Sequence, residues 1–220
     1  MSNLSISAKP LIELEVNAFL RKLAGPDATP GGGSAAALAG ALSGALVKMV
    51  GGLTVGRKGF EEVSETLEIM SEQGHQIAEK LAEAVDRDAA AYNEVMAAFA
   101  LSKATDEEKA VRSQAIQAAM KLAAEVPFEV AEECLAAAEL AAIAMEKGNP
   151  NASSDAAVAM LLALTGLEGA SLNVATNLDA IKDAEYVTAK KQELARLFAR
   201  AGELRGTMWE TVRTRIHSLP

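Results

Sequence analysis

The stretch TPGGGSAAALAGALSGALVKMVGG, residues 29–52, joins a turn of one proline and three glycines to a run of small residues with a single charge, Lys48. So little side-chain bulk is typical of a phosphate loop, a membrane span, or a helix that another backbone or a flat ligand approaches closely. A phosphate loop requires a Gly-Lys-Ser/Thr ending after a β-strand, and both are missing. The uncharged run 28–47 is mostly Gly, Ala and Ser, which disfavours a membrane span. We therefore predict a closely packed helix from Ser34 to about Thr54.

The composition also favours closely packed helices. Half of the 220 residues are hydrophobic but only 4% are aromatic, so the core must be built from Ala, Leu, Val and Met. The formal net charge of −9 argues against nucleic acid as a partner and leaves small-molecule chemistry or a protein partner. Cys134 is the only cysteine, which excludes an intrachain disulfide and fits a reducing compartment. The N-terminal sequence has no secretory pattern, so we expect a cytoplasmic protein that does not enter a membrane.

Apolar residues recur at helical spacing along the whole chain. No alternating strand pattern, internal repeat or Pro/Ser-rich linker divides it. Pro127 lies inside the fourth predicted helix, where it should produce a kink because proline removes a hydrogen bond and clashes with the preceding turn. We therefore predict a single all-α domain, residues 1–220, of about six long and roughly antiparallel helices. The predicted helices cover residues 10–25, 34–54, 63–99, 106–146, 156–176 and 179–217.

Asp88 interrupts an apolar stripe on the third predicted helix. That stripe runs from Val63 through Tyr92 to Phe99, mostly in steps of three or four residues, and we predict that it is buried. A buried carboxylate must be paired or hydrogen-bonded, or its pKa rises. Asp88 is therefore either a structural hydrogen-bonding group between two helices or a member of an active site.

A second polar group lies in the loop GNPNASSD, residues 148–155. Asp155 stands at the start of the most apolar helix, where it is either an N-terminal cap or a carboxylate held beside a cationic intermediate. Asn149 and Asn151 could add hydrogen bonds in the same loop. The loop is therefore a second candidate for a functional site.

The two ends of the glycine-rich helix offer further binding features. The first backbone N–H groups of a helix lack internal partners, so those of Gly32, Gly33 and Ser34 could face an anionic or planar ligand. Arg57 and Lys58 follow the helix, where they either complement its dipole or bind a ligand carboxylate. The single cysteine and the two histidines are scattered, which gives neither a nucleophile–base pair nor a metal-ligand spacing.

Several segments taken in order resemble the cyclodeaminase/cyclohydrolase family, over residues 19–215. They are the TPGGGS turn (29–34) with the helix after it, DRDAAAYNEVMAAFALSKATDEEKAVR (86–112), AAEVPFEVAEEC (123–134) and the GN-x-N-x-x-SD loop (148–155). This family contains the C-terminal domain of formiminotransferase-cyclodeaminase and the free-standing bacterial methenyltetrahydrofolate cyclohydrolases. The resemblance implies an all-helical fold, a homodimer, a tetrahydrofolate substrate that can be polyglutamylated, and no metal or other cofactor.

The chemistry that the resemblance implies suits these residues. A cyclohydrolase adds water to the cationic one-carbon bridge of 5,10-methenyltetrahydrofolate and forms 10-formyltetrahydrofolate, whereas a cyclodeaminase closes 5-formiminotetrahydrofolate with loss of ammonia. Both need a proton acceptor, a proton donor and negative charge beside a cation. The length matches the free-standing form, so cyclohydrolase ranks first and cyclodeaminase second. A folate-binding helical protein without catalysis is a third hypothesis.

Each candidate residue has a role within that hypothesis. We predict that Asp155 faces the one-carbon bridge and that Asp88 is a second carboxylate, which shifts its pKa or binds the pterin. Lys58, with Arg57 as the lesser candidate, would bind the glutamate tail or shuttle a proton. These roles require Asp88, Asp155 and Lys58 to converge on one cleft. The other predicted contacts with folate are the backbone N–H groups of Gly32, Gly33 and Ser34 and the side chains of Asn149 and Asn151.

Overall fold

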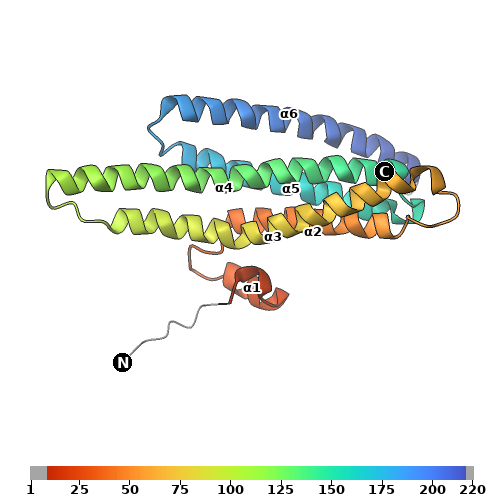
Figure 1. Cartoon of the computed structure of the whole chain (residues 1–220), viewed down its shortest axis with the longest axis horizontal. Coiled ribbons are helices and arrows are strands. Elements are labelled where there is room, and N and C mark those ends of the chain that lie inside the picture. Colours follow the sequence, from red (N-terminus) through yellow and green to blue (C-terminus); the bar gives the residue numbers. More distant parts are fainter. Residues whose placement is uncertain (1–8, 217–220) are drawn as a thin grey trace.

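The computed structural model describes residues 9–216, which form six α-helices and three short 3-10 helices without a β-strand. Figure 1 shows the long helices side by side as one elongated bundle. The predicted all-α architecture is therefore confirmed. The α-helices are α1 (Val16–Leu23), α2 (Gly32–Gly52), α3 (Ser64–Ala100), α4 (Asp106–Lys147), α5 (Ser153–Leu178) and α6 (Ala184–Arg215), and the 3-10 helices are η1 (Leu11–Glu13), η2 (Glu61–Val63) and η3 (Pro150–Ala152).

Four of these helices share the main core. Helices α2, α3, α4 and α5 pack against one another, and α6 covers α4 and α5. The core is rich in alanine, as the low aromatic content predicts, and the fully buried side chains include Leu67, Leu164 and Leu167. Helix α2 runs antiparallel to α3 and to α5, so the start of α2 lies beside the end of α5, whereas α4 runs parallel to α2 and to α6.

The small residues of α2 allow its backbone to approach its neighbours closely. A Cβ atom added at Gly44 would lie 2.6 Å from the carbonyl oxygen of Gly74 on α3. One added at Gly40 would lie 2.5 Å from Sγ of Cys134 on α4. Such separations are too short for van der Waals contact, so only glycine fits at these crossings. The close-packing interpretation of residues 29–52 is confirmed along the body of the helix.

Helices α2 and α5 are also long and apolar enough to cross a membrane by length and composition alone. About half of each apolar window is buried inside the bundle, 50% for α2 and 56% for α5. Core helices of a bundle pass the same test, because a helix covered by protein on several sides needs little polar surface.

The first predicted helix, 10–25, is wrong as a single element. The chain forms η1, becomes extended at Leu14, and then forms the short helix α1. The carboxylate of Asp86 on α3 accepts hydrogen bonds from the backbone N–H groups of Leu11 (2.6 Å) and Ile12 (3.1 Å). The first N–H groups of a helix have no partner within it, so these bonds cap the start of η1 and tie it to α3.

The fourth helix begins and continues largely as predicted. Thr105 and Glu108 form a capping box, in which the Thr105 hydroxyl accepts from the Glu108 N–H at 3.2 Å. Helix α4 continues without interruption through the buried Pro127, so a bend there stays a prediction. Helix α6 begins at Ala184, later than the predicted residue 179, and its predicted end at His217 lies outside the described residues.

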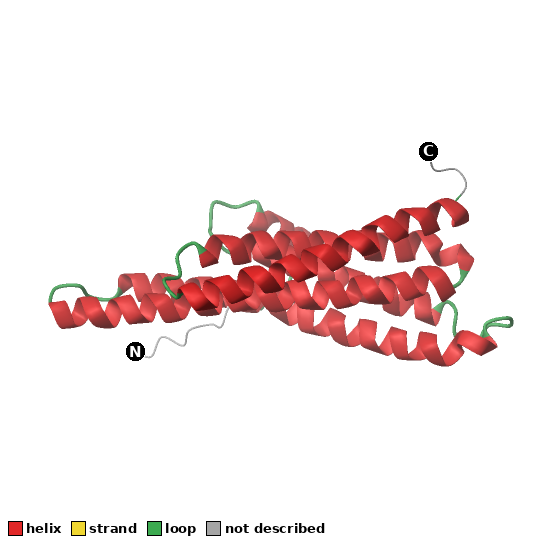
Figure 2. Ribbon diagram, turned by 90° about the horizontal axis from the view of Figure 1, so that it is seen from above, coloured by secondary structure: helices red, strands yellow, loops and turns green. Residues whose placement is uncertain are grey.

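The end of α3 and the start of α4 extend beyond the other helices as a two-helix hairpin. Figure 2 shows this hairpin projecting past the remaining helices. From Gln117 onward α4 is contacted by the segment after α5, because Gln117 bonds to Ala180 and Lys182. Helix α2 begins level with Asp88, since the Ser34 side chain contacts Val85 and Asp88, and it does not cover α3 beyond that point. Tyr92 and Phe99 are consequently 40% and 43% exposed, so the prediction that the apolar stripe is buried along its whole length is wrong.

Candidate active site

A cleft of about 370 Å³ lies where the glycine-rich turn meets the hairpin. The start of α2 and the end of α5 form one wall, and the facing stripes of α3 and α4 form the floor. Among the described residues that line it, Asp88 is the only charged one. The lining residues are Ala28, Thr29, Gly31, Gly32, Gly33, Asp88, Ala91, Tyr92, Val95, Met96, Phe99, Met120, Ala123, Asn173 and Asn177.

The carboxylate of Asp88 is held against the first turn of α2. Its Oδ2 atom accepts a hydrogen bond from the hydroxyl of Ser34 at 3.0 Å. A Cβ atom at Gly33 would overlap the same carboxylate, so the glycine at this position makes room for Asp88. Burial raises the pKa of Asp88, and the hydrogen bonds from the Ser34 side chain and backbone N–H partly oppose that rise.

Ser34 can serve either protonation state of Asp88. Its hydroxyl oxygen lies 2.9 Å from the carbonyl oxygen of Val85 as well as 3.0 Å from Asp88. A hydroxyl has one proton, so it donates to the charged carboxylate or, when Asp88 is protonated and donates to Ser34, to Val85. The hydrogen bond between Ser34 and Asp88 can therefore be kept in both protonation states of the carboxyl group, which suits a group that takes up and releases a proton.

Two asparagines on α5 complete the polar wall. The side-chain nitrogen of Asn173 donates to the carbonyl of Gly169 at 2.9 Å, and that of Asn177 donates to Ala123 at 2.6 Å. These bonds orient both amides and leave their oxygens as acceptors for a ligand. Sequence reasoning missed these residues, although their spacing of four on a mostly apolar helix places both on one face.

The rest of the floor is apolar and partly aromatic. Tyr92, Met96 and Phe99 follow one another along α3 at steps of four and three residues, and all three are exposed to at least 40%. Exposed rings beside one carboxylate suit a flat ligand that is apolar on its faces and polar at its edge.

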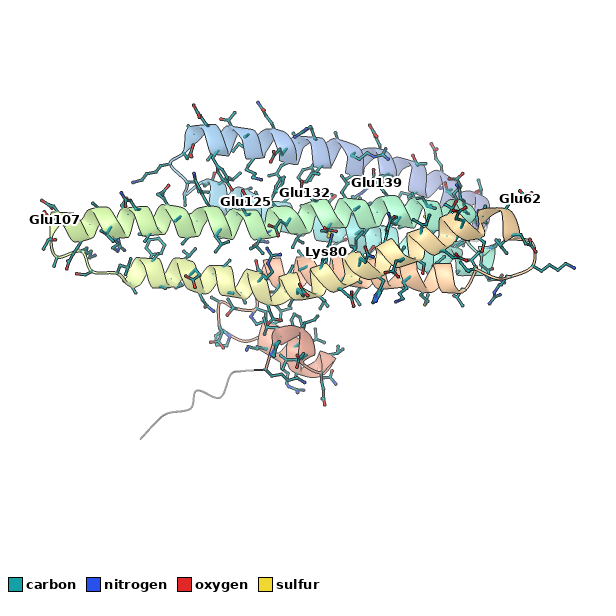
Figure 3. The ribbon with its side chains drawn as sticks, in the orientation of Figure 1. Glu62, Lys80, Glu107, Glu125, Glu132 and Glu139 are labelled. Atoms are coloured by element: carbon teal, nitrogen blue, oxygen red, sulfur yellow. The ribbon has the colours of Figure 1, made fainter. Side chains whose placement is uncertain are left out.

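The second group of predicted site residues lies at the opposite end of the helix bundle. Arg57 and Lys58 are exposed in the turn after α2, and Asp155 lies in the first turn of α5, where it does not cap the helix. Helix α2 has 21 residues, so at 1.5 Å per residue about 30 Å separates its two ends. Figure 3 shows Glu62 near this end of the bundle and Glu107 at the tip of the hairpin.

Asn149 has a structural role at that opposite end. Its backbone N–H donates to the Thr54 hydroxyl at 2.9 Å, its side chain donates to the Leu53 carbonyl at 3.2 Å, and its amide oxygen accepts from the N–H of Asn151 at 3.0 Å. These bonds fasten the loop 148–155 to the end of α2. One chain thus brings Asp88, Gly32, Gly33 and Ser34 together, but it does not bring Asp155, Lys58, Arg57, Asn149 or Asn151 to the same cleft.

The remaining titratable candidates do not form a reactive group. Cys134 is fully buried, and burial raises the pKa of its thiol to about 12, so the nucleophilic thiolate is scarce at neutral pH. His75 pairs with Glu79 at 3.5 Å on the surface of α3. Within residues 9–216, no cluster of three His, Cys, Asp or Glu side chains has the arrangement of a metal site.

Comparison with known proteins shows which proteins this chain resembles in sequence and fold. The methenyltetrahydrofolate cyclohydrolase of Methylorubrum extorquens is 41% identical over 202 residues, which cover 92% of this chain and 97% of the relative. The formimidoyltransferase-cyclodeaminase of Gallus gallus is 34% identical, over 88% of this chain but only 36% of its own length. The solved structure of formiminotetrahydrofolate cyclodeaminase from Thermotoga maritima superposes with a TM-score of 0.80 at 28% identity and covers 93% of this chain and 96% of the neighbour. The model of the formiminotransferase-cyclodeaminase family matches residues 15–196, and the chain therefore belongs to that family.

Proposed function

We propose that this protein is a methenyltetrahydrofolate cyclohydrolase, which converts 5,10-methenyltetrahydrofolate and water into 10-formyltetrahydrofolate at the cleft around Asp88. The relative of that name supports this choice, because it matches almost end to end. The observation that carries the proposal is the position of Asp88, a carboxylate with a raised pKa at the junction of a glycine turn and an aromatic floor. A cationic, planar substrate is complementary to that arrangement.

The proposed reaction needs one proton acceptor that later becomes a donor. Asp88 accepts a proton from water as the water oxygen bonds to the bridging carbon, which gives a neutral tetrahedral adduct. The bond from this carbon to N5 then breaks and N5 takes the proton from Asp88. The adduct hydroxyl loses its proton to solvent water as the formyl C=O forms, which accounts for the one proton that the overall reaction releases. A positioned acid–base group of this kind contributes about 10²–10⁴-fold to the rate.

The surroundings of Asp88 assist these steps in the proposed mechanism. The negative charge of the carboxylate attracts the cationic bridge, and the substrate displaces water from the apolar floor. The backbone N–H groups of Gly32 and Gly33, at the start of α2, can donate to the formyl oxygen as the C=O group forms, whereas that of Ser34 already bonds to Asp88. The amide oxygens of Asn173 and Asn177 accept hydrogen bonds from the N–H groups of the pterin.

A cyclodeaminase is the second candidate, supported by the likeness to the Thermotoga maritima cyclodeaminase and by the vertebrate relatives. Its substrate also passes through a tetrahedral carbon between two nitrogens, so the same cleft can serve it. The near-ultraviolet absorbance of the methenyl form separates the two. Purified protein that bleaches 5,10-methenyltetrahydrofolate is a cyclohydrolase, whereas absorbance that grows from 5-formiminotetrahydrofolate identifies a cyclodeaminase. A protein that binds both folates without either change would contradict catalysis.

We also propose a homodimer that is formed by the outer faces of α2 and α5. These faces expose Leu42, Met49, Val158, Leu161 and Leu172, the last to 70%, and α2 has one charged residue in 21. Contiguous apolar surface of this kind is typical of an interface. A two-fold axis that sets the two α2 helices antiparallel would bring Asp155 of the partner subunit to the Asp88 cleft, and so unite the two groups of predicted residues.

Complementation tests that arrangement. The variants Asp88→Asn and Asp155→Asn are purified separately, mixed, unfolded together and refolded, and the turnover of 5,10-methenyltetrahydrofolate is measured. If both residues act and each site combines two chains, mixed dimers contain one intact site, so roughly a quarter of wild-type activity returns. Failure of the mixture to regain activity, with dimers present in sedimentation, would place each site within one chain.

A further inference from the structure

A cation on α4, Arg112, lies beyond the aromatic part of the cleft and is not among the residues that line it. Met120 and Ala123 line the cleft, and Arg112 lies on the same stripe of that helix, because residues 112, 116, 120 and 123 follow at steps of four, four and three. Arg112 therefore lies on the helix face that also carries Met120 and Ala123, two turns nearer to the hairpin tip than Met120.

Arg112 is held in place by Phe99, the last lining residue of the cleft on α3. Its Nε and Nη2 atoms donate to the Phe99 carbonyl at 3.2 and 3.0 Å, and its guanidinium carbon lies 5.6 Å from the centre of the Phe99 ring. Two hydrogen bonds and the contact with the ring orient the guanidinium before any ligand arrives. This orientation lowers the entropic cost of binding a carboxylate.

The charge of Arg112 has no carboxylate partner within residues 9–216. Lys109, one turn away, pairs with Asp106 at 2.8 Å, and the Glu108 carboxylate accepts from Ser102, Ala104 and Thr105. Among the residues that the structure describes, the Nη1 atom of Arg112 has no hydrogen-bond partner. A cation that is fixed by its neighbours and left without a counter-ion is suited to an incoming anion.

The distance along the floor matches an elongated ligand with unlike ends. Eleven residues separate Asp88 from Phe99 on α3, which corresponds to about 16 Å at 1.5 Å per residue. A carboxylate stands at one end, apolar and aromatic side chains lie between, and a guanidinium stands at the other. A folate has the same order, with a pterin, a benzoyl ring and a glutamate that carries free carboxylates.

We propose that Arg112 binds the α-carboxylate of the substrate's glutamate tail, so that the folate lies along the hairpin with its benzoyl ring on Tyr92, Met96 and Phe99. This assignment rests on the proposed function. It replaces Lys58 of the same chain, which lies at the far end of the bundle, as the group that receives the tail. Further γ-linked glutamates would continue past the hairpin tip into solvent, so the site accepts polyglutamates without enlargement.

The test compares two substrates that differ only in the tail. Wild type and Arg112→Gln are assayed with 5,10-methenyltetrahydrofolate and with 5,10-methenyltetrahydropteroate, which lacks the glutamate. Loss of a charge-assisted hydrogen bond predicts that the KM for the folate rises about tenfold or more, while the KM for the pteroate and both kcat values stay within about twofold. Arg112→Lys should recover only part of the affinity. Lys109→Gln is the matched control and should leave both substrates unchanged.

A binding measurement separates failure of this inference from failure of the proposed reaction. Calorimetric titration with 5-formyltetrahydrofolate and 5-formyltetrahydropteroate needs no turnover. Tail-dependent weakening by Arg112→Gln supports the site even in a protein that hydrolyses neither substrate, in which case only the proposed reaction is wrong. Equal weakening for both ligands, or no weakening for either, overturns the role of Arg112 as a tail-binding residue.

Discussion

The hydroxyl of Ser34 on α2 lies 3.0 Å from the carboxylate of Asp88 on α3, and it is 2.9 Å from the backbone carbonyl of Val85. The pair connects the glycine-rich turn to the helix that supplies the floor of the cleft. It also couples the proton of the hydroxyl to the protonation state of the carboxylate. Changes to this pair and to the core beneath it should therefore alter activity, pH dependence and stability in distinct ways.

Replacement of Asp88 by asparagine should abolish most turnover. The amide keeps the shape and a hydrogen bond to Ser34 but cannot accept a proton from water, so kcat should fall by about 10²–10⁴-fold. The loss of methenyl absorbance measures the rate, and circular dichroism checks the helical content. Glu83→Gln, a change on the same helix outside the cleft, is the control. Turnover within about threefold of wild type would exclude Asp88 as the acid–base group.

Replacement of Ser34 by alanine should move the acid limb of the pH–rate profile to higher pH. Hydrogen bonds from Ser34 lower the pKa of Asp88 against the larger effect of burial, which raises it. Alanine removes the side-chain bond and keeps the backbone N–H, so the pKa of Asp88 rises further and the base form is lost at a higher pH. The profile of kcat/KM against pH measures the shift. An unchanged or downward-shifted limb contradicts the assignment of that limb to Asp88.

The same raised pKa predicts how stability depends on pH. A carboxyl group whose pKa is higher in the folded than in the unfolded protein binds its proton more tightly when folded, so its contribution to stability falls as pH rises from the unfolded pKa through the folded pKa. Asp88→Asn should therefore be more stable than wild type at neutral pH, and the difference should shrink in acid. Urea unfolding at several pH values measures it. A variant that is less stable than wild type at neutral pH would show that the ionised group is net stabilising.

Gly33→Ala should lower kcat, whereas Gly52→Ala should stabilise the protein, although both glycines belong to α2. The new methyl at residue 33 would overlap the Asp88 carboxylate, so it should displace that group and lower kcat. The space beside Gly52 is open to 4 Å. Alanine is the better helix former by about 0.5–1 kcal/mol in a helix interior, and by less at Gly52 because it is the last residue of α2. Turnover and thermal unfolding of the two variants measure the contrast. Full activity of Gly33→Ala would show that the carboxylate tolerates displacement.

Cys134 should resist thiol reagents in the folded protein. It is fully buried between α2 and α5, and its pKa is raised to about 12. Ellman's reagent should therefore report almost no thiol in native conditions and one thiol per chain in guanidinium. Rapid reaction of the native protein would indicate that the helices around Gly40 and Gly166 separate readily.

The helical class can be predicted from the sequence, because apolar periodicity and the capping box at Thr105 are local signals. The point at which one helix stops covering another is not a local property. The stripe through Tyr92 and Phe99 looks like core on its own helix, and its exposure depends on the start of α2, which is encoded some sixty residues earlier.

Some of the site residues can be identified from the sequence and others cannot, again because only some of them give a local signal. Asp88 can be identified because it interrupts an apolar stripe, and its glycine partners because they form an unusual turn. Asn173 and Asn177 give no comparable signal, because an amide pair near the end of an apolar helix also suits a plain helix end. The distance between Gly33 and Lys58 can be inferred, since the predicted helix 34–54 already requires about 30 Å between its ends.

The projecting α3–α4 hairpin has a consequence for motion. From Gln117 onward α4 bonds to Ala180 and Lys182, so the less covered part of the hairpin is residues 89–116. Its amides should exchange with solvent through local opening at a lower free energy than those of the core. A ligand that bridges Asp88 and Arg112 would bind only the closed form and would protect those amides by mass action. Hydrogen exchange in residues 89–116 would then report occupancy of the cleft.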